Sequence, residues 1–160
     1  METDYDRLIS LLVAGGVEFI IIGGAAATAH GSSRLTMDLD VVYSRSKENI
    51  KRLVKTLQPL QPKLRDVPED LRFRWDEETV RKGLNFTLTT SAGALDLFGE
   101  ITGGGAFEQL APDSIKLSVF GNQCLCLGLE RLIKVKQAAG RPKDRETIAE
   151  LKAILQEQRS

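Results

Sequence analysis

Two aspartates, Asp38 and Asp40, stand two residues apart in the apolar stretch Met37–Tyr43. The alternation predicts a strand over residues 37–43, so both carboxylates project from one face while Leu39 and Val41 point into the core. Carboxylates this close raise each other's pKa unless a cation lies between them, and Mg²⁺ binds carboxylate oxygens together with phosphate oxygens of a substrate. The pair therefore predicts a metal site; the alternative is the polar edge of a half-exposed strand.

A glycine pair precedes these aspartates. Residues 18–22 are almost wholly apolar and predict a central strand buried on both faces, and the alanine-rich residues 25–30 predict a short helix. Gly23 and Gly24 join the two, and glycine lets an anion approach the backbone N–H groups at the start of a helix. This arrangement favours phosphate binding at Gly23 and Gly24, with an ordinary tight turn as the alternative.

The remaining apolar periodicity predicts the elements that must position these residues. Helices are expected over residues 4–14, 46–57, 129–139 and 143–156, and strands over residues 84–90, 94–101, 115–120 and 123–127. Hairpin turns are expected at residues 91–93 and at Gly121-Asn122, and residues 103–105 are expected to form a flexible link. Three prolines among charged residues predict that residues 58–76 form a long solvated loop without regular structure.

The segment IIIGGAAATAHGSSRLTMDLDVV resembles the signature of the polymerase-β-like nucleotidyltransferase superfamily, in which two small residues and a spacer precede Asp-apolar-Asp. Within that superfamily the chain is most similar to minimal nucleotidyltransferases and to relatives of the AbiE-type abortive-infection toxin. The likeness covers residues 18–144 apart from the loop at 58–76. It implies one mixed α/β domain over residues 1–160, with a central sheet from strands near 18–22, 37–43 and 94–101 and with helices at the C-terminal end.

The resemblance also implies further site residues. Asp96, in the segment ALDLF, would share a metal with Asp38 and Asp40 and assist deprotonation of the attacking hydroxyl. The segment LIKVKQAAGRPKD resembles a basic element of the same family, in which Lys136, Arg141, Lys143 and Asp144 match. These cations would offset the negative charge of a triphosphate. The alternative is that they only stabilise the C-terminus of a helix through its dipole.

The implied activity is magnesium-dependent transfer of a nucleoside monophosphate from an NTP such as ATP to an acceptor hydroxyl, with release of pyrophosphate. Two Mg²⁺ ions are expected, with Mn²⁺ as the alternative ion. The acceptor, a small molecule, a protein or a tRNA end, stays open, and a partner protein or a second copy of the chain is expected to complete its site. Ala25 replaces a serine common in the family and Thr147 replaces an acid. Both favour the rival interpretation, a catalytically weak partner-binding protein such as a toxin–antitoxin component.

Composition sets outer bounds on the function. The 22 basic and 22 acidic residues balance, so any surface that binds phosphate must be local. The longest apolar run, Phe19–Ile22, is far shorter than the roughly 20 residues of a membrane span. The acidic start of the chain is unlike an export signal, and a cytoplasmic location is the expectation.

Cys124 and Cys126, two apart in a predicted strand, are expected to be buried structural thiols.

Overall fold

Strand β1 (Phe19–Ile22) lies near the middle of the molecule, and all four of its side chains are buried. The computed structural model describes residues 3–31 and 38–160, and β1 belongs to a mixed seven-stranded sheet with the order β3-β4-β5-β2-β1-β9-β8. The other strands of this sheet are β2 (Leu39–Tyr43), β3 (Lys63–Leu64), β4 (Phe86–Thr90), β5 (Gly93–Phe98), β8 (Ser114–Val119) and β9 (Asn122–Leu127). A separate two-stranded sheet pairs β6 (Glu100–Ile101) with β7 (Gly105–Ala106).

The register of the three central strands aligns the residues that matter for function. Strand β2 pairs antiparallel with β1 and parallel with β5. Asp40 lies opposite Ile22 on one side and opposite Asp96 on the other. The end of β1, Asp40 and Asp96 therefore form a row across three neighbouring strands.

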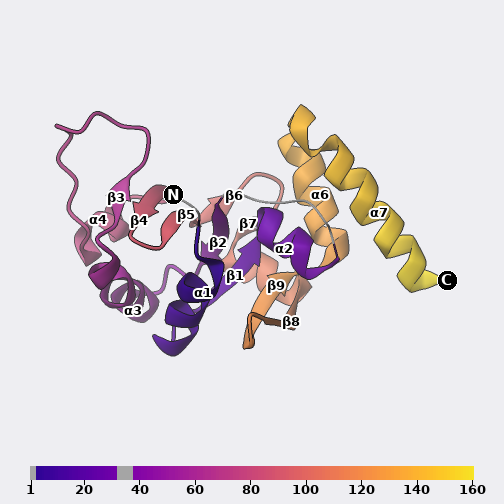
Figure 1. The fold of residues 1–160 in the computed structure, drawn as a ribbon, viewed down its shortest axis with the longest axis horizontal. Coiled ribbons are helices and arrows are strands. Elements are labelled where there is room, and N and C mark those ends of the chain that lie inside the picture. The colour runs from indigo at the N-terminus through magenta and orange to yellow at the C-terminus, as the bar shows by residue number, and fades with distance from the viewer. Residues whose placement is uncertain (1–2, 32–37) are drawn as a thin grey trace.

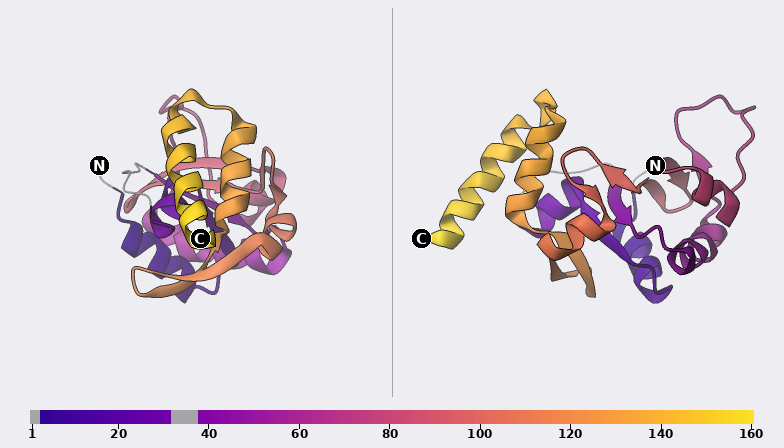
Figure 2. Two further views of the ribbon diagram at one scale, coloured as in Figure 1. Left: turned by 90° about the vertical axis from the view of Figure 1, so that its right-hand side faces the viewer. Right: turned by 180° about the vertical axis from the view of Figure 1, so that it is seen from behind.

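Helices pack around this sheet and against one another. The α-helices are α1 (Tyr5–Ala14), α2 (Gly23–Ala29), α3 (Lys47–Leu57), α4 (Glu77–Lys82), α5 (Phe107–Leu110), α6 (Leu129–Ala139) and α7 (Arg145–Arg159). Short 3₁₀ helices are η1 (Gln58–Leu60), η2 (Ala111–Asp113) and η3 (Pro142–Asp144). Helix α1 contacts α3 and β9, while α2 contacts α6. Helices α6 and α7 form a helical hairpin at one end of the molecule (Figures 1 and 2).

Most of the predicted helices and strands are present, and the sequence features that predicted them explain where they begin and end. The Asp4 carboxylate caps α1 and the Ser46 hydroxyl caps α3, so each accepts a hydrogen bond from a free amide of the first turn. Helix α6 ends at Gly140 in a left-handed conformation with φ of 64°. The three strands predicted to form the centre of the sheet do so. The thiols of Cys124 and Cys126 are both buried and free, as expected.

The interpretation of residues 58–76 as a loop without regular structure is wrong at its N-terminal end. Residues 58–60 form η1, and Lys63–Leu64 form β3, which pairs with β4 at the edge of the sheet. The prolines of this segment lie outside the two residues of β3 and therefore leave its ladder intact. Helix α4, capped by Asp76, was not predicted at all.

Two connections also differ from expectation. The β8–β9 turn is centred on Phe120 and Gly121, one residue earlier than predicted, and both have positive φ. Two positive φ values belong to the tight hairpin turn whose twist matches its strands. Residues 103–105 do not form a flexible link, because 103 and 104 lie in the turn of the β6–β7 hairpin and Gly105 belongs to β7. The predicted strand over 94–101 divides after Phe98. Met37, the predicted start of β2, lies outside the described residues.

None of the helices within residues 3–31 and 38–160 combines the length and apolar character that a membrane crossing requires.

Candidate metal and nucleotide site

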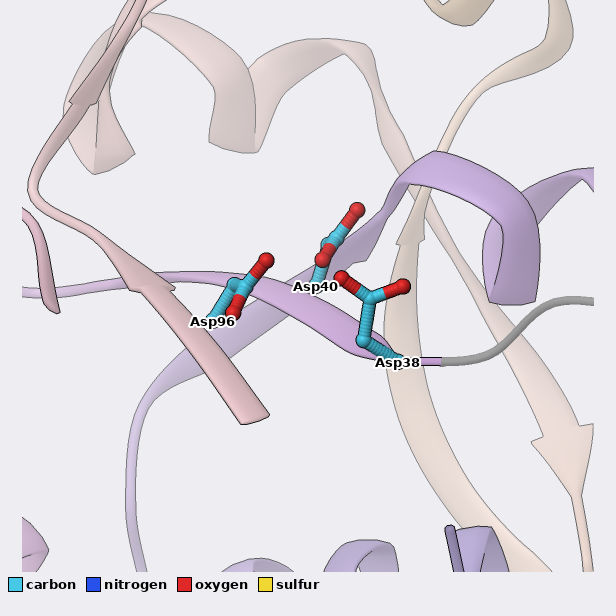
Figure 3. Close-up of side chains that lie close together, drawn as sticks. All are labelled: Asp38, Asp40 and Asp96. Carbon is cyan, nitrogen blue, oxygen red and sulfur yellow. The ribbon is translucent and has the colours of Figure 1, made fainter. Parts of the chain in front are cut away.

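Three carboxylates converge at the row formed by β2 and β5. Asp38 lies directly before β2, Asp40 lies within it, and Asp96 comes from β5. Each offers one oxygen, and the three oxygens lie within 4.8 Å of one another (Figure 3). The structure thus brings together all three acids that the sequence analysis singled out.

The Asp40 carboxylate is the most deeply placed of the three. Its pKa is raised to about 8, first by burial and then by the negative charges of Asp38 and Asp96, while Arg141 lowers it. Among the described residues, its Oδ1 atom is buried and has no hydrogen-bond partner. A buried carboxylate oxygen without a partner is costly unless a cation or another donor reaches it.

These observations test whether a divalent cation suits the site. The donor set consists of carboxylate oxygens, which Mg²⁺ and Mn²⁺ prefer, and the orphaned Asp40 oxygen faces neighbours of its own charge. The residues therefore fit a divalent cation.

Gly23 makes room for this arrangement. It has φ of +68°, and a Cβ atom added to it would lie 2.4 Å from Oδ2 of Asp40. Only glycine adopts this conformation readily, and only glycine leaves that space free. Gly24 follows it in the first turn of α2. Gly23 thus lies directly against Asp40.

The basic element after β9 is split between a buried and an exposed part. The ammonium of Lys136 lies 3.6 Å from Oδ1 of Asp144, and both side chains are less than a tenth exposed. Arg141 donates through Nε to Oδ2 of Asp144 over 2.9 Å and is about half exposed. Its charge is close enough to lower the pKa of Asp40. Lys143 is exposed in η3, and in the described part of the chain it forms no ion pair with the three aspartates.

Sequence analysis missed Arg65, which follows β3. Its Nη2 atom donates to Oδ1 of Asp96 over 2.5 Å and lies 3.7 Å from Oδ2 of Asp38. Burial raises the pKa of Asp96, and the guanidinium of Arg65 opposes that rise. The apolar Leu64 beside Arg65 was the only local hint of a strand here, and the neighbouring prolines outweighed it.

The fold is similar to that of several proteins of known structure. No family model and no curated protein matches the sequence. Among solved structures, the lincosamide antibiotic adenylyltransferase LnuA, bound to lincomycin, aligns with a TM-score of 0.63 at 15% identity over 96% of this chain and 98% of that one. ANT(2″)-Ia in complex with adenylyl-2″-tobramycin aligns with a TM-score of 0.54 at 16% identity over 99% of this chain and 100% of the other.

A Thermotoga maritima protein assigned to the nucleotidyltransferases aligns with a TM-score of 0.55 at 13% identity over 93% of this chain and 94% of its own. Full-length alignments with several such proteins show that the chain has the polymerase-β-like nucleotidyltransferase fold, with a mixed sheet and C-terminal helices. That fold confirms the expectation drawn from the sequence. The more specific likeness to AbiE-type toxins stays a prediction.

Proposed function

We propose that this protein is a metal-dependent nucleotidyltransferase that transfers a nucleoside monophosphate from an NTP to an acceptor hydroxyl. The observation that carries the proposal is the cluster of Asp38, Asp40 and Asp96, in which Oδ1 of Asp40 has no hydrogen-bond partner within residues 3–31 and 38–160. The fold supports the same conclusion, because the similar solved structures include two antibiotic-modifying enzymes of this class.

In the proposed reaction the acceptor oxygen forms a bond to the α-phosphorus, and the bond from that phosphorus to the bridging oxygen breaks. Pyrophosphate leaves with the electron pair, and the hydroxyl proton passes to the carboxylate of Asp96. A divalent cation held by Asp38, Asp40 and Asp96, either Mg²⁺ or Mn²⁺, would neutralise phosphate charge and align the displacement. Asp40 would lie nearest the glycine pair, since it packs directly against Gly23.

Cationic side chains and backbone N–H groups complete the proposed binding site for the NTP. Gly23 and Gly24 would let the phosphates approach the backbone at the start of α2. Arg141 is an accessible cation, since it is about half exposed and its charge reaches Asp40. Lys136 is buried against Asp144 and would act by supporting Arg141 through that shared carboxylate. Lys143, which is exposed, would contact the leaving pyrophosphate only from the solvent side.

The acceptor is proposed to be a small molecule that carries a hydroxyl. LnuA is seen with lincomycin and ANT(2″)-Ia with adenylyl-tobramycin, and both are close to this chain in length. ATP is the proposed donor, because LnuA is an adenylyltransferase and the tobramycin product is adenylylated. A cytoplasmic location, where ATP and Mg²⁺ are plentiful, would suit this reaction.

The test is calorimetric titration of each NTP into the protein with and without Mg²⁺, on the wild type and on Asp38→Asn/Asp40→Asn. Metal-dependent binding that the double variant loses is the expected result. Asp6→Asn, an exposed carboxylate of α1, is the matched control and should bind as the wild type does. A pyrophosphate-release assay over a panel of hydroxyl acceptors, antibiotics included, then identifies the acceptor.

Failure of every NTP to bind would overturn the proposal. It would favour a catalytically weak protein that binds a partner, for which Ala25 and Thr147 are the residues in question. A partner of that kind, or a second copy of the chain, would then appear as a larger species in light scattering.

A further inference from the structure

Arg65 directly follows β3, the edge strand of the sheet, and its side chain reaches the carboxylate cluster on β5 and β2. Its backbone N–H donates to the carbonyl of Thr87 over 2.9 Å, which continues the short β3–β4 ladder by one bond. Its Nη1 atom donates to the carbonyl of Leu88 over 2.8 Å. The backbone bond and the Nη1 bond aim Nη2 at Asp96 and Asp38. The guanidinium is therefore held in place by β4 and is not a side chain that only happens to lie near the acids.

The position of Nη2 divides the cluster electrostatically. This one nitrogen contacts Asp96 at 2.5 Å and lies 3.7 Å from Asp38. The positive charge of the guanidinium therefore lies beside Asp96 and Asp38. Arg65 makes no hydrogen bond or ion pair with Asp40 in the described structure, and Oδ1 of Asp40 is left without a partner. Arg65 thus neutralises one side of a site that carries three carboxylates.

A divalent cation would bind two of the same carboxylates, Asp38 and Asp96, that Arg65 now contacts. Oδ1 of Asp96 is engaged by the guanidinium at the short end of hydrogen-bond distances. Two cations a few ångströms apart repel each other strongly in a partly buried site, so the ion and the guanidinium cannot both bind these carboxylates at full strength. Binding of the ion and contact by Arg65 must therefore compete.

We propose that Arg65 is a positioning residue of this site: it holds Asp38 and Asp96 together while no divalent cation is bound, and it exchanges with that cation when the site loads. The proposal rests on the proposed function only in treating the three aspartates as the metal ligands.

The chain around Arg65 allows such an exchange. On its N-terminal side the chain is held to the sheet by the two residue pairs of β3 and by the hydrogen bond from the Arg65 N–H to the carbonyl of Thr87, which together form a short edge ladder. On its C-terminal side the next core contacts are made by Phe73, which is partly buried, and by Trp75, which is buried and donates through its indole N–H to the carbonyl of Val54 over 3.1 Å. Residues 66–72 in between are all exposed. Release of Arg65 would thus loosen this exposed stretch within residues 65–74.

The decisive experiment measures Mn²⁺ binding without nucleotide, by electron paramagnetic resonance, in the wild type and in Arg65→Gln. Loss of the competing charge should tighten Mn²⁺ binding by about tenfold or more. Arg65→Lys keeps the charge and should stay within about threefold of the wild type. Arg72→Gln, an exposed arginine of the same segment, is the matched control and should leave the affinity unchanged.

A second measurement uses the unaltered protein, so it does not depend on any variant folding. Addition of Mn²⁺ should speed hydrogen exchange of the peptide that spans residues 65–74, and should leave the peptide that spans α3 unaffected. Slower or unchanged exchange in residues 65–74 would mean that Arg65 stays in place when the metal binds.

The outcomes separate this proposal from the proposed function. If Asp38→Asn/Asp40→Asn abolishes Mn²⁺ binding and Arg65→Gln binds Mn²⁺ no more tightly than the wild type, the metal site stands and the exchange is wrong. If the double variant binds Mn²⁺ as the wild type does, the three aspartates are not the metal ligands, and the proposed function fails with them.

Discussion

Gly23 and Asp40 are packed so closely that no side chain fits at residue 23. A Cβ atom there would lie 2.4 Å from Oδ2 of Asp40 and about 3.1 Å from its Cβ and Cγ atoms. The glycine also has φ of +68°, which other L-residues seldom adopt. The end of β1 and the deepest carboxylate of the site therefore depend on each other, although the sequence separates them by a whole helix.

Gly23→Ala should accordingly displace Asp40 and damage the site. We expect a loss in the free energy of unfolding of about 2 to 4 kcal/mol, from the strained backbone together with the clash. Mn²⁺ affinity should fall by about tenfold or more, since ligand geometry is lost. Urea denaturation and Mn²⁺ titration measure the two effects.

Gly121→Ala is the control for Gly23→Ala. Gly121 has φ of +77°, and nothing among the described residues lies within 4 Å of a Cβ added there. It should therefore show only the backbone cost of about 1 kcal/mol and keep wild-type Mn²⁺ binding. Equal effects of the two substitutions on Mn²⁺ affinity would contradict a close link between Gly23 and Asp40.

The pKa of Asp40 makes the stability of the metal-free protein depend on pH. The pKa is about 8 in the folded protein against an ordinary 3.8, so the folded state keeps a proton that the unfolded state loses near pH 4. The stabilisation is full below pH 4 and is lost as the pH rises to about 8. Between pH 5 and 8.5 in EDTA, we expect the free energy of unfolding to fall by roughly 3 to 5 kcal/mol through this group.

Asp40→Asn should remove most of that pH dependence, because its amide carries no charge at either pH. The variant should be more stable than the wild type at pH 8.5, where the wild type has to bury a carboxylate. Asp6→Asn, at an exposed position of α1, should keep the wild-type profile. Unfolding profiles of Asp40→Asn and the wild type that run parallel from pH 5 to 8.5 would refute the assignment of the slope to Asp40.

The strand that holds Asp40 and the loop that holds Arg65 show what sequence can predict here. Strand β2 was predictable, because its alternation and its neighbouring glycines are local signals that agree with the buried pattern of the sheet. Asp96 is a lone acid in its predicted strand, which carries no such local signal, and it gained its role only from the family resemblance. Its place beside Asp40 depends on the parallel pairing of β2 with β5, which is a long-range contact.

Arg65 could not be predicted for a related reason. Strand β3 has two residues, far too few for a periodic pattern, and its register against β4 decides where the guanidinium lies. The turn at Phe120 and Gly121 shows the same limit on a smaller scale. If the β8–β9 turn moves by one residue, nearly the same apolar side chains still face the core. Only the backbone pairing of the two strands distinguishes the two registers.

Asp144 supports two cations and should matter for stability as well as for nucleotide binding. It pairs with the buried ammonium of Lys136 and accepts a hydrogen bond from Arg141. Asp144→Asn leaves the Lys136 charge buried without a counter-ion, so we expect a loss of about 3 kcal/mol in the free energy of unfolding. NTP affinity should fall with it, because Arg141 is no longer held in place.

Arg141→Gln separates these two effects of Asp144. Arg141 is about half exposed, so its removal should change the free energy of unfolding by less than about 0.5 kcal/mol. NTP affinity should nevertheless fall by about tenfold if Arg141 contacts the triphosphate. Urea denaturation and calorimetry on both variants provide the measurements. NTP affinity left at the wild-type level in Arg141→Gln would remove Arg141 from the nucleotide site.

Asn49, which sequence analysis did not single out, fastens α3 to the central strands and yields a prediction on stability alone. Its side chain is fully buried; Oδ1 accepts from the N–H of Glu18 over 2.6 Å, and Nδ2 donates to the carbonyls of Glu18 and Ser44. Asn49→Ala should lower the free energy of unfolding by about 3 kcal/mol, because three hydrogen bonds are lost and, among the described residues, only the Glu18 carbonyl keeps another donor, the N–H of Ser44.

Asn49→Asp tests whether this cost comes from hydrogen bonding or from volume. The aspartate fills nearly the same space and can still accept from Glu18, but it sets a carboxylate against the carbonyl oxygens of Glu18 and Ser44. It should therefore be at least as destabilising as Asn49→Ala in urea denaturation at pH 8. Lys51→Ala, on the exposed face of the same helix, should change the free energy of unfolding by less than about 0.5 kcal/mol. If Asn49→Asp proves as stable as the wild type, packing and not the donated hydrogen bonds holds α3 against β1 and β2.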